Sequence, residues 1–227
     1  MARIKRRDFI KNATTISAFT ILTPQVAFGT QNNSAIRIGM IGCGNRGTSV
    51  LTTMSANTNI NIIALADLFN DKLALARKKL GKCNVDKGFA DIQGKNIYQG
   101  SGAYMELQDN KNVDAVLIST PAYAHPEILL AAVAAGKHAW CEKPAAIDIH
   151  GCKQILEISE KIKNQLSVVL GFQIRHATPY VEMVRRIQRG DIGEIVCVQL
   201  YYFSSDTSVK PHEGMTYDEA RIRNHFH

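Results

Sequence analysis

Apolar residues along this chain follow two different periods, which alternate from residue 36 onward. Short and nearly continuous apolar runs predict buried strands, and runs with apolar residues at every third or fourth position predict amphipathic helices. The predicted strands are residues 36–41, 60–66, 113–119, 137–141 and 166–172. The predicted helices are residues 48–54, 71–80, 104–107, 126–135, 148–163 and 180–189. This alternation is typical of an α/β fold with a doubly wound parallel sheet.

The stretches between these elements carry turn signals. Residues 81–102 hold five glycines and many polar residues, which predicts a surface loop with a short strand near 97–98. Pro121 ends the strand 113–119, because proline cannot continue a ladder, and Gly136 ends the helix 126–135. Residues 195–203 are rich in β-branched and aromatic side chains and predict one further strand.

Three glycines follow the first predicted strand at the spacing G-x-G-x-x-G, and a helix comes directly after them. In this context Gly42 makes the tight turn, Gly44 lets the backbone approach a pyrophosphate, and Gly47 lets the helix pack on the strand. The phosphates then lie at the positive end of the helix, next to Asn45 and Arg46. The sequence therefore predicts a dinucleotide site.

The second predicted strand ends at Asp67, 20 residues past Gly47. A carboxylate at this place accepts hydrogen bonds from the hydroxyls of an adenosine ribose. No arginine stands beside it, which favours NAD over NADP because a carboxylate repels a 2′-phosphate. An alternative role for Asp67 is to cap the following helix, and the two roles are compatible.

Two more strand ends carry candidate site residues. In parallel sheets of this kind, ligands bind outside the carboxyl ends of the strands. The stretch from Thr120 and Pro121 to His125 follows one strand, and Glu142, Lys143 and Pro144 follow the next. We therefore expect both stretches to face the same crevice as the glycines.

Composition narrows the possible functions. The chain has 227 residues, of which 45% are hydrophobic, so it can bury a substantial core. The net charge of +7 includes +4 from residues 1–29, and the remaining +3 is not gathered in a basic patch interleaved with aromatics, so nucleic acid binding is not favoured. The five widely spaced cysteines predict neither a metal site nor a disulfide framework and read as buried apolar residues.

The N-terminus carries the features of an export signal. Residues 5–11, Lys-Arg-Arg-Asp-Phe-Ile-Lys, resemble the twin-arginine motif, and a mildly apolar run and small residues near position 29 follow. We therefore predict a signal peptide over residues 1–29, a twin-arginine translocase as partner and a periplasmic destination; a basic, amphipathic or disordered tail is the alternative. Because a periplasm has no free nicotinamide pool, an exported dinucleotide enzyme is expected to hold its cofactor tightly.

The spaced motifs together resemble the Gfo/Idh/MocA family of oxidoreductases. The motifs are the glycine loop 42–47, Ser-Thr-Pro-x-x-x-His at 119–125, Ala-Gly-Lys-His at 135–138 and Glu-Lys-Pro at 142–144. The resemblance implies a Rossmann domain, here residues 30–147, and a C-terminal substrate and oligomerisation domain built on an open, mostly antiparallel sheet, here residues 148–227. It also implies NAD or NADP chemistry on sugars, cyclitols or related polyols, in a homo-oligomer.

The resemblance assigns roles to individual residues. Lys143 matches the lysine that lies beside the nicotinamide and the reacting carbinol, where an ammonium stabilises an alkoxide and moves a proton. Pro144 would aim this lysine, with a cis or a trans bond. His125 would line the cofactor pocket, unless it caps the helix that follows it. Gln173 falls where the family contacts its cofactor from the next strand end.

The chain departs from the family in its last third. Family members carry a second catalytic element, Asp-x-x-x-His, which does not occur here, and His225 and His227 lack that spacing to an acid. We therefore expect a truncated copy of an exported oxidoreductase. One alternative is an NAD-dependent glycoside hydrolase of the same family; these hydrolases tend to carry E-V-P where this chain has E-K-P. The other alternative is a dinucleotide-binding fragment without catalysis.

Overall fold

The computed structural model describes residues 34–163, 165–172, 174–203 and 213–224. The predicted signal peptide, Gln173, His225 and His227 lie outside these ranges. The described residues from Ile36 onward belong to one compact unit.

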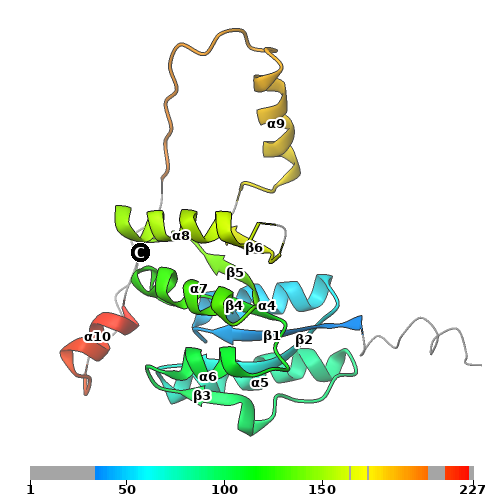
Figure 1. The fold of residues 1–227 in the computed structure, drawn as a ribbon, viewed down its shortest axis with the longest axis vertical. Coiled ribbons are helices and arrows are strands. Elements are labelled where there is room, and N and C mark those ends of the chain that lie inside the picture. The colour runs from blue at the N-terminus through cyan, green and yellow to red at the C-terminus, as the bar shows by residue number, and fades with distance from the viewer. Residues whose placement is uncertain (1–33, 164, 173, 204–212, 225–227) are drawn as a thin grey trace, which may run out of the picture. The chain divides into compact units, whose positions relative to one another are not determined.

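Six parallel strands form one sheet in the order β3-β2-β1-β4-β5-β6 (Figure 1). The strands are β1 (Ile36–Ile41), β2 (Ile60–Asp67), β3 (Ile97–Gln99), β4 (Ala115–Ile118), β5 (His138–Glu142) and β6 (Val168–Gly171). The α-helices are α4 (Asn45–Asn57), α5 (Asn70–Asp86), α6 (Ala103–Asp109), α7 (His125–Ala134), α8 (Ile149–Lys161), α9 (Thr178–Gln188) and α10 (Tyr217–Arg223). The predicted doubly wound parallel sheet is confirmed.

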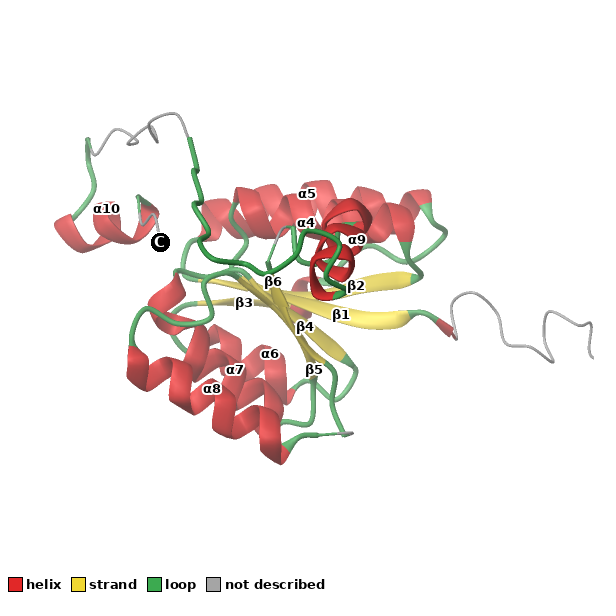
Figure 2. Cartoon of the chain, turned by 90° about the horizontal axis from the view of Figure 1, so that it is seen from above, coloured by secondary structure: helices red, strands yellow, loops and turns green. Residues whose placement is uncertain are grey.

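Helices cover both faces of the sheet, with α4 and α5 on one side and α6, α7 and α8 on the other (Figure 2). Successive strand residues point to opposite faces, so the apolar runs feed two cores. Met40 packs with Leu51 of α4 and Leu73 of α5, whereas the next residue, Ile41, packs with Leu129 of α7. Burial on both faces explains why these strands read as continuous apolar runs.

The sheet extends past the predicted domain boundary at residue 147. Strand β6 pairs with β5 from Ala139↔Val168 to Glu142↔Gly171 and so completes the same sheet, with α8 as the crossover. Helix α5 is also longer than predicted, because it continues through the buried Gly81 to Asp86 instead of ending at Leu80.

The strand predicted at 195–203 is wrong for this structure. Residues 193–203 have no regular secondary structure, and their side chains are exposed, with Val196 at 93% and Phe203 at 92%. A strand needs a hydrogen-bonded neighbour, and within the described residues none pairs with this segment. Helix α10 was not predicted from the sequence pattern.

Asn84, at the end of α5, replaces a missing strand neighbour of β2. Strand β3 pairs with β2 only from Leu65 to Asp67. Upstream, Asn84 accepts a hydrogen bond from Ile62 N at 3.1 Å and donates one to Ile62 O at 2.7 Å. Its side chain is buried and also donates to Ala90 O at 3.2 Å. This amide therefore satisfies backbone groups that the short β3 leaves open.

We expect Asn84→Leu to lower the free energy of unfolding by about 2–4 kcal/mol, because a buried N–H and a buried C=O of Ile62 lose their partners. Urea unfolding measures this loss. Asn57→Leu is the control, since that side chain bonds only Thr53 O on an exposed helix end and its loss is expected to stay within about 0.5 kcal/mol. A loss below about 1 kcal/mol for Asn84→Leu would contradict the assigned role.

Arg37 of β1 and Asp114, just before β4, tie two adjacent strands together. Arg37 Nη2 lies 2.6 Å from Asp114 Oδ1, and Arg37 Nε and N both donate to Asp114 Oδ2 at 2.9 Å. The side-chain hydrogen bond from Arg37 is the main cause that lowers the pKa of Asp114. Such a carboxylate stabilises the fold above its unfolded pKa, about 3.9, and loses this contribution as the pH falls through its lower folded pKa.

We expect Asp114→Asn to lower the free energy of unfolding at neutral pH by about 0.5–1 kcal/mol, a small value because both side chains are more than a third exposed. As the pH falls below the unfolded pKa of about 3.9 and then through the lower folded pKa of Asp114, the difference from the wild type is expected to shrink, because the carboxylate becomes protonated in the folded state as well. Urea unfolding at several pH values measures both quantities. A difference that stays constant down to low pH would contradict the ion pair as its source.

Candidate functional site

The carboxyl ends of the central strands bring the predicted site segments together. Gly42 N donates to Ala66 O at 2.9 Å, which joins the glycine loop to the end of β2. Ser119 N donates to Ile41 O at 2.8 Å, which joins the loop after β4 to the end of β1. Glu142 ends β5 on the other side of β4. All described site candidates therefore lie along one edge of the sheet.

The glycine loop has the geometry that a diphosphate requires. Gly42 has φ +90°, and a Cβ there would lie 2.5 Å from Ser119 O; a Cβ on Gly47 would lie 2.6 Å from Gly42 O. Gly44 differs, because nothing lies within 4 Å of the place its Cβ would take. Helix α4 starts directly after Gly44, without a side-chain cap and without an acidic residue in its first turn. Its N–H groups are therefore available to an anion.

Asp67 lies against the glycine loop. Its carboxylate accepts hydrogen bonds from Cys43 N at 2.6 Å and from Phe69 N at 2.9 Å. Burial raises the pKa of Asp67, while these two backbone bonds act in the opposite direction. Helix α5 begins at Asn70 with Phe69 as its N-cap, so the alternative that Asp67 caps this helix is wrong.

Arg223 of α10 lies at the same corner of the sheet, and the sequence carried no signal for it. Its guanidinium binds both carboxylate oxygens of Asp71 at 2.8 and 3.0 Å and lies 3.8 Å from the centroid of the Phe69 ring. It also donates to Glu219 at 2.8 Å. Arg223, 152 residues beyond Asp71, is thus held by two carboxylates and the Phe69 ring at the start of α5.

His125 connects the two loops that follow β4 and β5. One ring nitrogen, Nδ1, lies 2.7 Å from Pro144 O, and the other, Nε2, lies 2.9 Å from Thr120 O. The side chain is buried at 1% exposure, and α7 has Ala124 as its N-cap without a side-chain bond, so the capping alternative is wrong. The hydroxyl of Thr120 is buried and has no hydrogen-bond partner among the described residues, which leaves it available to a ligand.

Glu142 and Lys143 stand at the end of β5. The Glu142 carboxylate is buried and accepts from Arg46 Nη2 at 3.1 Å and from Trp140 Nε1 at 3.4 Å. Lys143 is half-buried, and the peptide bond to Pro144 is cis, which settles the isomer that the sequence left open. Pro121, on the neighbouring loop, precedes the short 3₁₀ helix Ala122–Ala124.

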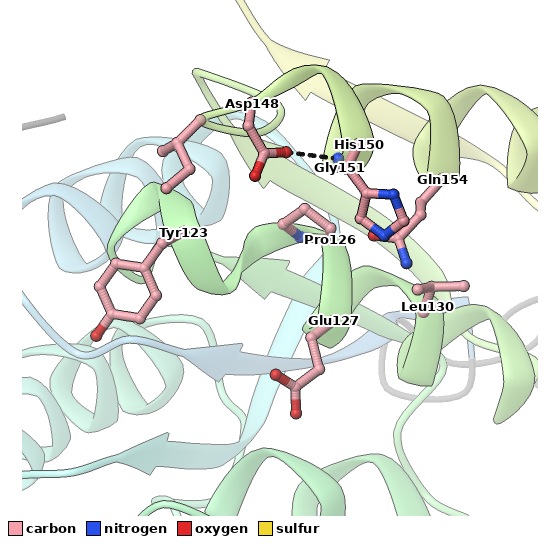
Figure 3. A pocket seen from close by; sticks show the side chains of 9 residues that line it. Tyr123, Pro126, Glu127, Leu130, Asp148, His150, Gly151 and Gln154 are labelled. Atoms are coloured by element: carbon pink, nitrogen blue, oxygen red, sulfur yellow. Dashed lines mark hydrogen bonds between the residues drawn. The ribbon is translucent and has the colours of Figure 1, made fainter.

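A pocket of about 290 Å³ lies away from these residues, between the first turns of α7 and α8 (Figure 3). Nine residues line it: Tyr123, Pro126, Glu127, Leu130, Ile147, Asp148, His150, Gly151 and Gln154. Its two carboxylates already have structural roles, since Asp148 caps α8 by accepting from Gly151 N at 2.7 Å and Glu127 accepts from the Tyr104 hydroxyl at 2.6 Å. We therefore place the functional site at the strand ends.

The cysteines agree only in part with the sequence reading. Cys43 and Cys141 are buried, Cys83 is partly buried, and Cys152 and Cys197 are exposed. Burial raises the pKa of Cys43, and burial raises that of Cys141 to about 12, so neither thiol ionises readily. Among the described residues, no cluster of His, Cys, Asp and Glu could hold a metal ion, and no helix is both long and apolar enough for a membrane span.

The fold and this edge define a class of protein. A parallel sheet, a glycine loop opening onto an uncapped helix and an acid at the end of β2 are the parts of a dinucleotide-binding Rossmann domain. The open space at Gly44 and the unpartnered Thr120 hydroxyl fit such a ligand.

Comparison with known proteins gives the family. Residues 36–170 match the Gfo/Idh/MocA model, described as "Oxidoreductase family, NAD-binding Rossmann fold". The chain belongs to this family, and the predicted resemblance, the Rossmann fold and NAD as the family's cofactor are confirmed.

The relatives include inositol dehydrogenases and glycosyl hydrolases. The chain is 31% identical over 188 residues to inositol 2-dehydrogenase 3 of Saccharopolyspora erythraea, covering 82% of this chain and 51% of that protein. It is 34% identical over 128 residues to a glycosyl hydrolase family 109 protein of Solibacter usitatus, covering 56% and 28%. A solved scyllo-inositol dehydrogenase from Lactobacillus casei, with bound NAD(H) and scyllo-inositol, aligns with a TM-score of 0.56 at 25% identity, covering 70% and 43%. The chain spans about half the length of the first curated relatives it matches.

Proposed function

We propose that this protein is an exported NAD-dependent oxidoreductase that acts on an inositol-like polyol or a sugar by hydride transfer at a carbinol carbon. The observation that carries the proposal is the placement of Lys143 at the end of β5, on the edge of the sheet that also presents the glycine loop and Asp67. Relatives named inositol dehydrogenases support the choice of substrate class.

The residues present divide the work of binding the cofactor. The N–H groups at the start of α4 would hold the diphosphate, with Gly44 giving it room, and Asp67 would accept from the adenosine ribose. Thr120, with its unpartnered hydroxyl, and Pro121 would line the groove beside them, and His125 would hold that loop in place. The cofactor contact predicted for Gln173 remains a proposal, since this residue lies outside the described ranges. NAD itself supplies the hydride acceptor.

Lys143 would act on the substrate oxygen. An ammonium group at this place donates a hydrogen bond to a carbinol oxygen and stabilises the negative charge that develops on it as hydride leaves. The same amine could also exchange the proton of that oxygen as a general acid or base. The partial burial of Lys143 fits this role.

Export follows from the N-terminal motif rather than from the described residues. The paired arginines of residues 5–11 and the apolar run behind them support recognition by the twin-arginine translocase, which carries folded proteins with cofactor loaded. The same motif supports a periplasmic location with tightly held NAD, and the family resemblance supports a place in carbohydrate metabolism. We further propose that the family's homo-oligomer forms through the part of the protein that follows the Rossmann domain.

A glycoside hydrolase is the second candidate. The family 109 relatives favour it, one of them aligned over 94% of this chain at 27% identity. In that case bound NAD would be reduced and reoxidised within each cycle. Lys143, in place of the valine that such hydrolases tend to carry, favours the dehydrogenase.

Incubation of the purified chain with NAD and either myo-inositol or an aryl glycoside separates the candidates. Formation of NADH with myo-inositol or a free sugar supports the dehydrogenase, and release of the aglycone without net NADH supports the hydrolase. Binding of NAD without either reaction supports a dinucleotide-binding module. Failure of the folded chain to bind NAD would overturn all three.

A further inference from the structure

Arg46 belongs to the first turn of α4, where the proposed function places the diphosphate of a dinucleotide. Its Nη2 lies 3.1 Å from Oε1 of Glu142, a residue 96 positions further along the chain. The two partners differ in freedom, because the Arg46 side chain is 58% exposed and that of Glu142 only 6%. Arg46 is therefore the solvent-exposed partner of this ion pair, and Glu142 is the buried one.

Glu142 is held in place by its surroundings. Trp140 Nε1 donates to the same oxygen, Oε1, that Arg46 binds. Strand β6 also packs directly against this carboxylate, because a Cβ on Gly171 would lie 3.1 Å from Glu142 Oε1 and 3.0 Å from Trp140 Nε1. The carboxylate cannot follow Arg46 away from this position, so it is a fixed negative charge near the glycine loop.

We propose that Glu142 is an internal competitor of the dinucleotide diphosphate for Arg46, and that it thereby weakens dinucleotide binding. An arginine that turns from Glu142 to a diphosphate exchanges one charged hydrogen bond for another, so only part of its attraction appears as affinity. The buried carboxylate also repels the diphosphate through a poorly screened environment. The inference rests on dinucleotide binding in the loop 42–47 and not on the identity of the substrate.

Glu142 is therefore expected to weaken dinucleotide binding, whereas a favourable cofactor contact would strengthen it. A residue that contacts the cofactor favourably loses affinity when it is neutralised, whereas a competitor gains it. Glu142→Gln keeps the size and the capacity to accept from Trp140 while removing the charge. We expect it to tighten binding of ADP-ribose about three- to tenfold, which corresponds to roughly 0.7–1.4 kcal/mol. Arg46→Met is expected to weaken that binding about tenfold.

The double variant tests the shared arginine. If Glu142 acts through Arg46, most of the gain from Glu142→Gln is absent when Arg46 is already Met. Isothermal titration of all four proteins with ADP-ribose measures this, and adenosine, which lacks phosphates, serves as the control ligand whose affinity is expected to stay unchanged. Unchanged or weaker ADP-ribose binding by folded Glu142→Gln would overturn the proposal. Equal gains in both backgrounds would overturn the shared arginine.

The wild-type chain offers a second readout that needs no Glu142 variant. Trp140 is the only tryptophan of the chain and shares Glu142 Oε1 with Arg46. Withdrawal of Arg46 changes the charge beside the indole, so ADP-ribose is expected to change the tryptophan fluorescence of the wild type but not of Arg46→Met at saturation. If the wild type binds ADP-ribose with no fluorescence change, the competition for Arg46 is contradicted, but the proposed function is not. A folded wild type that does not bind ADP-ribose overturns the proposed function as well.

Discussion

Replacing Gly42 by alanine is expected to lower the free energy of unfolding by about 2–4 kcal/mol and to abolish measurable NAD binding. Gly42 has φ +90°, a conformation that costs an alanine roughly 1–2 kcal/mol. The added Cβ would also lie 2.5 Å from Ser119 O and 2.8 Å from Thr120 N, which are backbone atoms that cannot turn aside. The loop after β4 would therefore have to move, and the crevice with it.

Gly44→Ala is the matched control for this prediction. The space around Gly44 is open, and its φ of −72° suits an alanine. We expect its free energy of unfolding to stay within about 0.5 kcal/mol of the wild type. NAD binding is nonetheless expected to weaken at least about tenfold, because the methyl group occupies the space that the diphosphate needs.

Urea unfolding and calorimetric titration with NAD measure the two quantities separately. The contrast between the variants is the decisive result, since Gly42→Ala acts through the fold and Gly44→Ala acts only through the ligand. If Gly44→Ala binds NAD as the wild type does, the diphosphate does not lie on this loop. If Gly42→Ala is as stable as the wild type, the contact with Ser119 is not a constraint.

Replacing Lys143 by methionine is expected to lower kcat for polyol oxidation by roughly 10²–10⁴-fold, the usual contribution of a positioned acid or base. Methionine keeps most of the length and apolar stem of lysine but can neither donate to the substrate oxygen nor transfer a proton. NAD affinity is expected to change by less than about threefold, because the diphosphate and the ribose are held elsewhere. The loss therefore belongs to the chemical step.

Lys143→Arg and Lys153→Met complete this experiment. Arginine keeps the positive charge but does not release a proton at working pH, so Lys143→Arg is expected to recover only part of the rate. Lys153 is exposed on α8, and its replacement is expected to leave the rate unchanged. NADH formation from NAD and myo-inositol is measured for each variant, relative to a wild-type protein that shows this turnover. Turnover of Lys143→Met within tenfold of the wild type would remove Lys143 from the reaction.

Some parts of the fold were predictable because they depend on local pattern. A strand buried on both faces must be apolar at consecutive positions, so β1, β2, β4, β5 and β6 were readable as apolar runs. The helix after the glycines was readable from the spacing of its apolar residues, although it begins earlier than predicted, directly after Gly44. The glycine positions were readable because no other residue tolerates the backbone at Gly42 and Gly47.

Other parts depended on contacts between distant residues. Helix α5 continues through Gly81, although glycine costs about 1 kcal/mol relative to alanine in a helix, because Asn84 in its last turn is bonded to β2. Gly81 itself is buried, and a side chain there would meet the carboxylate of Asp91. The segment 195–203 has strand composition, but composition supplies no hydrogen-bonding partner. His125 was recognisable from the sequence as a candidate site residue, but the short distances from its two ring nitrogens to the carbonyl oxygens of Pro144 and Thr120 were visible only in three dimensions.

The amino-acid sequence alone determined the class of fold, the dinucleotide loop, the acid at the end of β2 and the lysine that we propose for the chemistry, because each depends on residues within one strand and the turn that follows it. Only the tertiary structure decided which groups meet across those turns: Arg46 with Glu142, His125 with Thr120 and Pro144, and Arg223 with Asp71. Such pairs join residues far apart in the chain, and the packing of the sheet, not a local pattern, sets the distance between them.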